Sequence, residues 1–138
     1  MAAVVDGDNL TKGGQVEVRE LTRVLVRVAE AVREYPVTFA MQRRLAVRYM
    51  TAYSGLGWGI RFASMEPDAA DHLLVEAAED HARHAVTDLV VASGDHAFAE
   101  LASTARLHVL SYRSSLSRRL ELAATSVTYL DDLLPLAA

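Results

Sequence analysis

Residues 87–101 of the chain read TDLVVASGDHAFAEL. The run at 88–93 is apolar and has two β-branched residues at its centre, which favours a buried strand over a helix. Ser93-Gly94-Asp95 is a turn-forming sequence, and an acid directly before HAFAEL is typical of a helix N-cap. The stretch therefore predicts a strand, a tight turn and a helix, with Asp95 at the junction.

Short apolar runs and amphipathic segments alternate in the same way along the rest of the chain. Between residues 15 and 34, apolar residues recur at helical spacing among Arg and Glu, as in an amphipathic helix, and Pro36 then ends the pattern. The predicted strands cover residues 2–5, 37–41, 59–65, 88–93, 107–112 and 127–130. The predicted helices cover about 15–34, 43–53, 67–85, 96–104 and 115–124.

This order of elements predicts an α/β fold. Strands separated by single helices run parallel with right-handed crossovers, which gives a three-layer α/β/α sandwich with a mostly parallel sheet, of the Rossmann-like kind. The 138 residues fit one domain spanning 1–138. In such sheets ligands bind at the carboxyl ends of the strands, so the polar residues that follow the predicted strands are the candidates for a site.

Composition narrows the chemistry. The chain has no cysteine, which excludes disulfides and thiolate ligands, so any metal is held by carboxylate, amide, imidazole or water. The net charge of -4 does not indicate a uniformly basic nucleic-acid-binding face. No apolar run approaches the ~20 residues needed to span a bilayer, and the first residues do not resemble a secretory signal. We therefore expect a cytoplasmic protein with no membrane partner.

Carboxylates follow three of the predicted strands. Asp6 comes directly after the first strand, Asp71 lies near the start of the helix after the third, and Asp95 follows the fourth. Carboxylates that converge in a partly dry cleft repel one another unless a cation or protons neutralise them. Oxygen ligands suit Mg²⁺ or Mn²⁺, so we expect one of these ions at Asp6, Asp71 and Asp95, with Asn9 fixing a bound water or a phosphate oxygen.

Helix capping is the competing explanation for acids in these positions. Asp8, Asp68 and Asp95 each lie where a helix begins, and an acid there accepts free backbone N–H groups and meets the helix dipole favourably. Capping does not require the acids to share one end of the sheet, although every helix of this architecture begins at that end. The convergence of three carboxylates favours a metal site and leaves room for capping as well.

Three segments, in this order and with these gaps, resemble the NYN branch of the PIN-like ribonuclease superfamily. They are VVDGDNL at 4–10, DAADHLLVEAA at 68–78 and DLVVASGDHAFAELA at 88–102. The closing segment HVLSYRSSLSRRLELAATSVTYLDDL, at 108–133, also looks like the end of that domain. The resemblance covers nearly the whole chain and implies a single PIN-like domain.

What the resemblance implies is a metal-dependent endonuclease that acts on RNA. Asp6, Asp71 and Asp95 match the metal-binding and catalytic acids, Asn9 matches the polar catalytic residue of the first motif, and Ser93 matches the serine of the Ser-Gly-Asp motif. The chain departs from the family pattern in two places. Ala97 stands where many NYN domains have a second Asp, and Ala77, beside Glu76, falls where a further acid is expected.

Five residues are candidates for substrate binding. The substrate is expected to be single-stranded RNA, because the implied family cuts RNA and the segment after the fifth strand is rich in Ser and Arg, which contact phosphates. The candidate substrate-binding residues are Ser93, His96, Arg113, Ser115 and Arg118.

An exposed apolar helix face would also allow the protein to form a homodimer.

Two other functions remain open at this point. One is a non-catalytic PIN-like module that binds RNA or a protein, which Ala97 favours. The other is a haloacid-dehalogenase-type phosphatase, in which DGDN would supply Asp6 as nucleophile and Asp8 as general acid. That chemistry generally needs a lysine from the middle of the chain, and Lys12 is the only lysine present.

Overall fold

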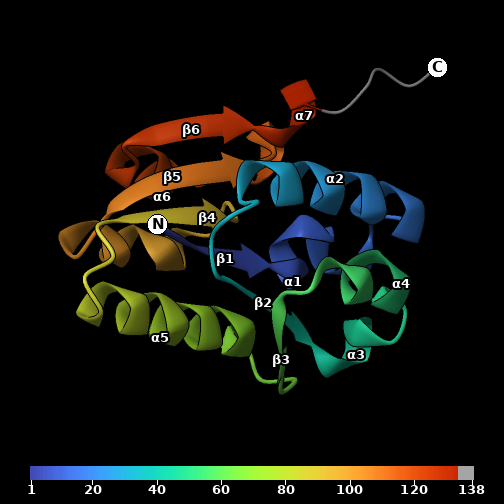
Figure 1. Cartoon of the computed structure of the whole chain (residues 1–138). Helices are drawn as coiled ribbons and strands as arrows, with labels where there is room; N and C mark the ends of the chain where they lie inside the picture. Colours follow the sequence, from blue (N-terminus) through green and yellow to red (C-terminus); the bar gives the residue numbers. More distant parts are fainter. Residues whose placement is uncertain (134–138) are drawn as a thin grey trace.

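A computed structural model describes residues 1–133 and contains a six-stranded sheet in the order β3-β2-β1-β4-β5-β6 (Figure 1). Every pair of neighbouring strands is parallel. This confirms the predicted α/β, Rossmann-like fold class. The strands are β1 (Ala2–Asp6), β2 (Val37–Gln42), β3 (Gly59–Ala63), β4 (Asp88–Ala92), β5 (Arg106–Ser111) and β6 (Ser126–Tyr129).

Helices connect the strands and cover both faces of the sheet (Figure 1). The α-helices are α1 (Gly7–Leu10), α2 (Val18–Ala31), α3 (Arg43–Ala46), α4 (Met50–Tyr53), α5 (Ala69–Arg83), α6 (Arg118–Ala123) and α7 (Leu130–Leu133). The 3-10 helices are η1 (Lys12–Gly14), η2 (Ser54–Leu56), η3 (His96–Ser103) and η4 (Arg113–Ser115).

Strand β1 explains why the sheet needs a layer on each side. All five of its residues are buried, and successive side chains point to opposite faces. Ala3 and Val5 join the apolar cluster formed with α2 and α4, whereas Ala2 and Val4 join the cluster formed with α5 and η3. A strand covered on both faces carries a continuous apolar run instead of an alternating pattern, as residues 2–5 of β1 do.

Three predicted helices differ from the observed ones. The helix predicted at 43–53 is broken at Tyr49, where φ is -101° and ψ is 9°, so α3 and α4 are separate short helices. The helix predicted from Pro67 begins at Ala69, because Asp68 adopts a left-handed conformation with φ of 61°. The segment after Asp95 is a 3-10 helix over most of its length, and α7 was not anticipated.

None of the helices formed by residues 1–133 has the length and apolar character that crossing a bilayer requires.

The strand order places β1 and β4 side by side at the centre of the sheet. From β1 the chain moves outward through β2 and β3, then returns across the sheet to β4 and moves the other way. This is the switch point of the topology, where ligands bind in open parallel sheets. Val5 is level with Ala92 in the β1–β4 ladder, so Asp6 and Ser93 are neighbours at the carboxyl edge.

Candidate active site

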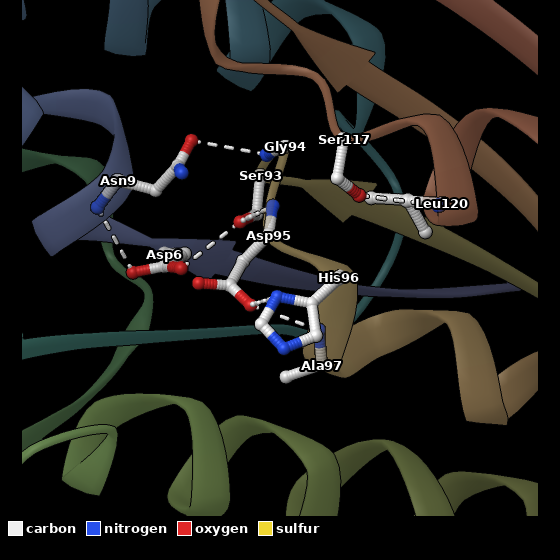
Figure 2. A network of polar contacts seen from close by, with 9 residues as sticks. All are labelled: Asp6, Asn9, Ser93, Gly94, Asp95, His96, Ala97, Ser117 and Leu120. Atoms are coloured by element: carbon white, nitrogen blue, oxygen red, sulfur yellow. Dashed lines mark hydrogen bonds and ion pairs between the residues drawn. The ribbon is translucent and has the colours of Figure 1, made fainter.

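Asp6 lies at the centre of a polar network on the carboxyl edge of β1 and β4 (Figure 2). Its side chain is almost fully buried, with 1% exposure, and both of its oxygens accept hydrogen bonds. Oδ1 accepts the backbone N–H of Asn9 at 3.2 Å, which caps α1, and Oδ2 accepts the hydroxyl of Ser93 at 2.9 Å. The carboxylate is therefore held in a fixed orientation.

Asn9 joins the first motif to the Ser-Gly-Asp turn. Its Oδ1 accepts the backbone N–H of Gly94 at 3.0 Å, and this bond fixes which end of the amide is oxygen (Figure 2). Asn9 also lines the cavity that contains Asp6. Its Nδ2 group is consequently placed as a hydrogen-bond donor at the edge of that cavity.

Asp95 caps the helix that follows it, as the sequence predicts. Its Oδ1 accepts the backbone N–H of Ala97 at 2.8 Å, and the Nδ1 atom of His96 lies 3.4 Å from the same oxygen. The backbone N–H of Asp95 donates to the hydroxyl of Ser93 at 3.1 Å. In Figure 2 the second oxygen of Asp95 points back toward Asp6. One oxygen thus serves the helix and the other faces the site.

Asp71, in the first turn of α5, completes the group of carboxylates and is only 6% exposed. Burial and the negative charge of Asp95 raise the pKa of Asp71 from 3.8 to about 6. Burial and the charge of Asp71 raise the pKa of Asp6 well above its usual range. The three carboxylates therefore interact electrostatically, and the fully ionised site is costly without a cation.

Two cavities meet at these carboxylates. The first has a volume of about 400 Å³ and contains Asp6, Asn9, Lys12, Gln42 and Ser115 in its wall. The second has a volume of about 420 Å³ and is lined mainly by α5 and η3. Asp68, Asp71 and Asp95 belong to both walls.

The donor set fits a hydrated cation better than a fully protein-bound one. Within residues 1–133, no three His, Asp or Glu side chains already stand in a metal-ligating arrangement. Mg²⁺, however, is usually held by one or two carboxylates and keeps several waters. Buried carboxylates with raised pKa values beside a 400 Å³ cavity supply the oxygen donors and the space for such an ion.

The predicted substrate-binding residues other than the arginines fall into two groups. His96 lines the second cavity and Ser115 lines the first, so both are accessible to a ligand at the carboxylates. Ser93 is different, because its exposure is 0% and its hydroxyl is engaged by Asp6 and by the backbone of Asp95. Ser93 is therefore placed to orient Asp6 and Asp95, and it lies outside both cavity walls.

The two arginines expected to bind phosphate are not in the cavity walls. Arg113 forms a two-pronged ion pair with Asp132, at 2.7 and 2.8 Å, and its guanidinium lies 4.3 Å from the ring centre of Tyr129. Its hydrogen-bonding edge is thus occupied within the protein. Arg118 contacts neither cavity, whereas its neighbour Arg119 lines the second one, because successive helix residues point in different directions.

Two features of the site were not anticipated. A Cβ atom on Gly94 would collide with the carbonyl oxygen of Ser115 and would lie 2.7 Å from the hydroxyl oxygen of Ser111. The turn can therefore be close to η4 only with glycine. Asp8 accepts the backbone N–H of Gln42 at 2.9 Å and so ties α1 to the end of β2 instead of capping its own helix. The only signals for them in the sequence were the turn-forming Ser-Gly-Asp, which contains Gly94, and the position of Asp8 two residues beyond β1.

Comparisons with known proteins support the fold but do not assign the chain to a family. No protein-family profile matches the sequence, and no curated protein matches it. The structure is similar to the crystal structure of a protein of unknown function, VPA0982, from Vibrio parahaemolyticus RIMD 2210633. The TM-score is 0.62 at 13% sequence identity, over 96% of this chain and 94% of that one. At this identity the similarity concerns the parallel α/β fold alone.

Proposed function

We propose that this protein is a metal-dependent ribonuclease of the PIN-like type, which cuts RNA phosphodiesters within the chain. The observation that carries the proposal is the convergence of Asp6, Asp71 and Asp95 at the switch point of the sheet. Burial and mutual repulsion raise the pKa values of Asp6 and Asp71, so the group is built to accept positive charge. The resemblance to NYN domains implies that the same three acids bind the metal.

In this proposal Asp6, Asp71 and Asp95 hold Mg²⁺ or Mn²⁺. When bound, the ion would activate water and offset the negative charge that develops on the phosphodiester. Ser93 fixes the Asp6 carboxylate through the 2.9 Å hydrogen bond. Asn9 offers its Nδ2 hydrogens to a phosphate oxygen or to an ordered water in the first cavity.

A non-catalytic PIN-like binding module is the second candidate. Ala97 lies in the wall of the second cavity, at the place where many NYN domains carry another acid. The described residues also lack a preformed three-ligand group. Such a module would bind RNA in a salt-sensitive way and cut nothing.

The phosphatase interpretation is less favoured by the residues present. That chemistry generally needs a lysine from the middle of the chain, and Lys12 is the only lysine. Failure of the protein to form an acid-stable phosphoenzyme with a phosphoryl donor would exclude the phosphatase function.

The deciding experiment combines metal titration with RNA cleavage on one preparation. Calorimetry should detect Mn²⁺ binding to the wild type, and a labelled single-stranded RNA should be cut only when Mn²⁺ or Mg²⁺ is present. Asp6→Asn and Asp95→Asn should abolish cleavage. Asp80→Asn is the matched control, because Asp80 lies on α5 but is 60% exposed and outside both cavity walls.

Three outcomes separate the candidates. Metal-dependent cleavage that only the two site variants lose supports the ribonuclease. RNA binding without cleavage selects the binding module. Cleavage that survives in Asp6→Asn and Asp95→Asn comes from a contaminating nuclease and contradicts the proposal.

A further inference from the structure

The two cavities at the carboxylates each contain one Lys or Arg among several acids, and the surroundings of that residue bear on where the RNA lies. Beyond the acids that both share, the wall of the second cavity adds three more acids and one arginine. Those residues are Glu76, Glu79, Glu100 and Arg119. The first cavity adds one acid beside Asp6, namely Asp8, and one lysine, Lys12. Both walls are net acidic, with six acids and Arg119 in the second and five acids and Lys12 in the first, so the first wall repels a polyanion slightly less, and a phosphate is expected beside its cation.

Lys12 occupies an unusual backbone conformation. Its φ is 52°, in the left-handed region, and Gly13 and Gly14 follow with φ of 71° and 99°. A residue with a side chain pays a conformational cost there, and such strain persists only where the surroundings enforce it. The glycines let the chain continue the turn that Lys12 begins. Lys12 therefore costs conformational free energy at this position, and a glycine in its place would avoid that cost.

Hydrogen bonds within the loop and from the turn between α3 and α4 hold this loop. Within it, the N–H groups of Gly14 and Val16 both donate to the carbonyl of Thr11 at 3.0 Å. From outside, Arg48 donates to the carbonyls of Gly14 and Val16, and the hydroxyl of Tyr49 also donates to Val16. The loop is thus fixed to the turn between α3 and α4 and cannot relax its strain freely.

Packing against an aromatic ring also holds the ammonium group of Lys12 in place. It lies 4.7 Å from the ring centre of Tyr112, a side chain that is 4% exposed and therefore immobilised by packing. In the part of the chain that the structure describes, Lys12 forms no ion pair with a carboxylate. Its charge remains available to a ligand in the first cavity, unlike that of Arg113.

We infer that Lys12 contacts a backbone phosphate of the RNA, and that the strand reaches the carboxylates through the first cavity. This inference rests on the proposed ribonuclease function and assigns its substrate path. The strand passes over η1 and α1 beside Gln42 and Ser115, and the acidic wall of α5 and η3 bounds it on the other side. Arg113 and Arg118 have no part in phosphate binding.

The test measures cleavage of a labelled single-stranded RNA at several salt concentrations. Lys12→Asn removes the charge with a residue that tolerates positive φ, and Lys12→Arg restores the charge. Lys12→Asn should raise KM roughly tenfold with kcat nearly unchanged, because it removes one phosphate contact. The slope of log(1/KM) against log[salt] should become shallower by about 0.7, as expected for one contact on a single strand. Lys12→Arg should recover most of the affinity.

Arg113→Gln and Arg118→Gln are the controls and should keep the wild-type KM. If Lys12→Asn fails to fold, Lys12→Gly relieves the backbone strain and tests the same loss of charge. RNA cleavage with an unchanged KM and salt slope in the Lys12 variants would overturn the inference and leave the ribonuclease standing. A larger effect in Arg113→Gln or Arg118→Gln would also overturn it. A wild type that cuts no RNA under any metal condition would remove the proposed function, and this inference with it.

Discussion

The hydroxyl of Ser93 donates a 2.9 Å hydrogen bond to Oδ2 of Asp6, across 87 positions of sequence. The same hydroxyl oxygen accepts the backbone N–H of Asp95 at 3.1 Å. One buried side chain therefore fixes two of the three candidate metal ligands and joins the ends of β1 and β4. The serine of the Ser-Gly-Asp turn acts on the site through these two acids and does not touch the cavity.

Ser93→Ala should weaken both the fold and the metal site. It removes a donor to a buried carboxylate, and hydrogen bonds to charged groups contribute about 1.5–3 kcal/mol. The hydrogen bond from Ser93 lowers the pKa of Asp6, so its loss should raise that pKa further and reduce the affinity for Mn²⁺ at neutral pH. Urea unfolding and calorimetric titration measure the two effects.

Ser103→Ala is the matched control, because the Ser103 hydroxyl bonds only to the Glu100 carbonyl at an exposed position. A change of less than 0.5 kcal/mol is expected there, as for most surface substitutions. Equal stability losses in the two variants would contradict a special role for Ser93.

Asp95 has two functions that substitutions can separate. Its Oδ1 caps η3, and a capping side chain contributes about 1 kcal/mol. Asp95→Asn keeps a capping oxygen and removes a charge that repels Asp71, so the metal-free variant should be at least as stable as the wild type and should lose Mn²⁺ affinity. Asp95→Ala should lose both. A thermal unfolding series with and without Mn²⁺ measures the split, and an Asp95→Asn protein that binds Mn²⁺ as the wild type does would exclude Asp95 as a ligand.

Gly94→Ala should be among the most damaging single-methyl additions in the chain. The new Cβ would collide with the backbone of Ser115, which cannot move without displacing η4. Overpacking of this kind costs typically 1–3 kcal/mol, and the shift would also disturb the bond from the Gly94 N–H to Asn9. Gly55→Ala is the control, since no atom lies within 4 Å of its added Cβ. Equal unfolding free energies in the two variants would contradict the close approach of Gly94 to Ser115.

The sequence predicted the fold because its signals are local and agree with one another. Short apolar runs such as β1 and β4 alternate with amphipathic segments along the whole chain, which leaves parallel pairing as the simplest arrangement. The position of Asp6, Asp71 and Asp95 at one edge follows from that topology. The break between α3 and α4 could not be predicted, because it depends on the burial of Tyr49 and Tyr53 against other elements.

The side chains around the acids were harder to predict than the acids themselves. Arg113 looked free in the sequence, but Asp132 and Tyr129 engage it through contacts that only the folded C-terminal segment creates. Lys12 gave no pattern of its own, since its place depends on a left-handed turn. Hydrogen bonds over long sequence distances, such as Ser93 to Asp6, have no local signature either.

Asp71 should make the metal-free protein less stable as pH rises from about 4 to about 6. Its pKa is about 6 in the folded protein and near 3.8 when unfolded, so the folded state binds the extra proton between these values. The contribution of Asp71 to stability therefore falls with pH across that window and is constant above it. A shift of about two units corresponds to at most about 3 kcal/mol. Asp71→Asn should remove this part of the pH dependence, leave the part that comes from the burial of Asp6, and stabilise the metal-free protein at pH 7.

Mn²⁺ should reverse the trend, because the ion competes with the proton for the same carboxylates. Its stabilisation, which follows RT ln(1 + [Mn²⁺]/Kd), should be larger at pH 7.5 than at pH 5. Thermal unfolding of the wild type, Asp71→Asn and the exposed control Asp80→Asn, each with and without Mn²⁺, measures both effects. An Asp71→Asn protein that is less stable than the wild type at pH 7 without metal would contradict the electrostatic cost assigned to Asp71. If instead the substitution stabilises the fold and abolishes Mn²⁺ binding, the residue is maintained at the expense of stability, as expected of a functional ligand.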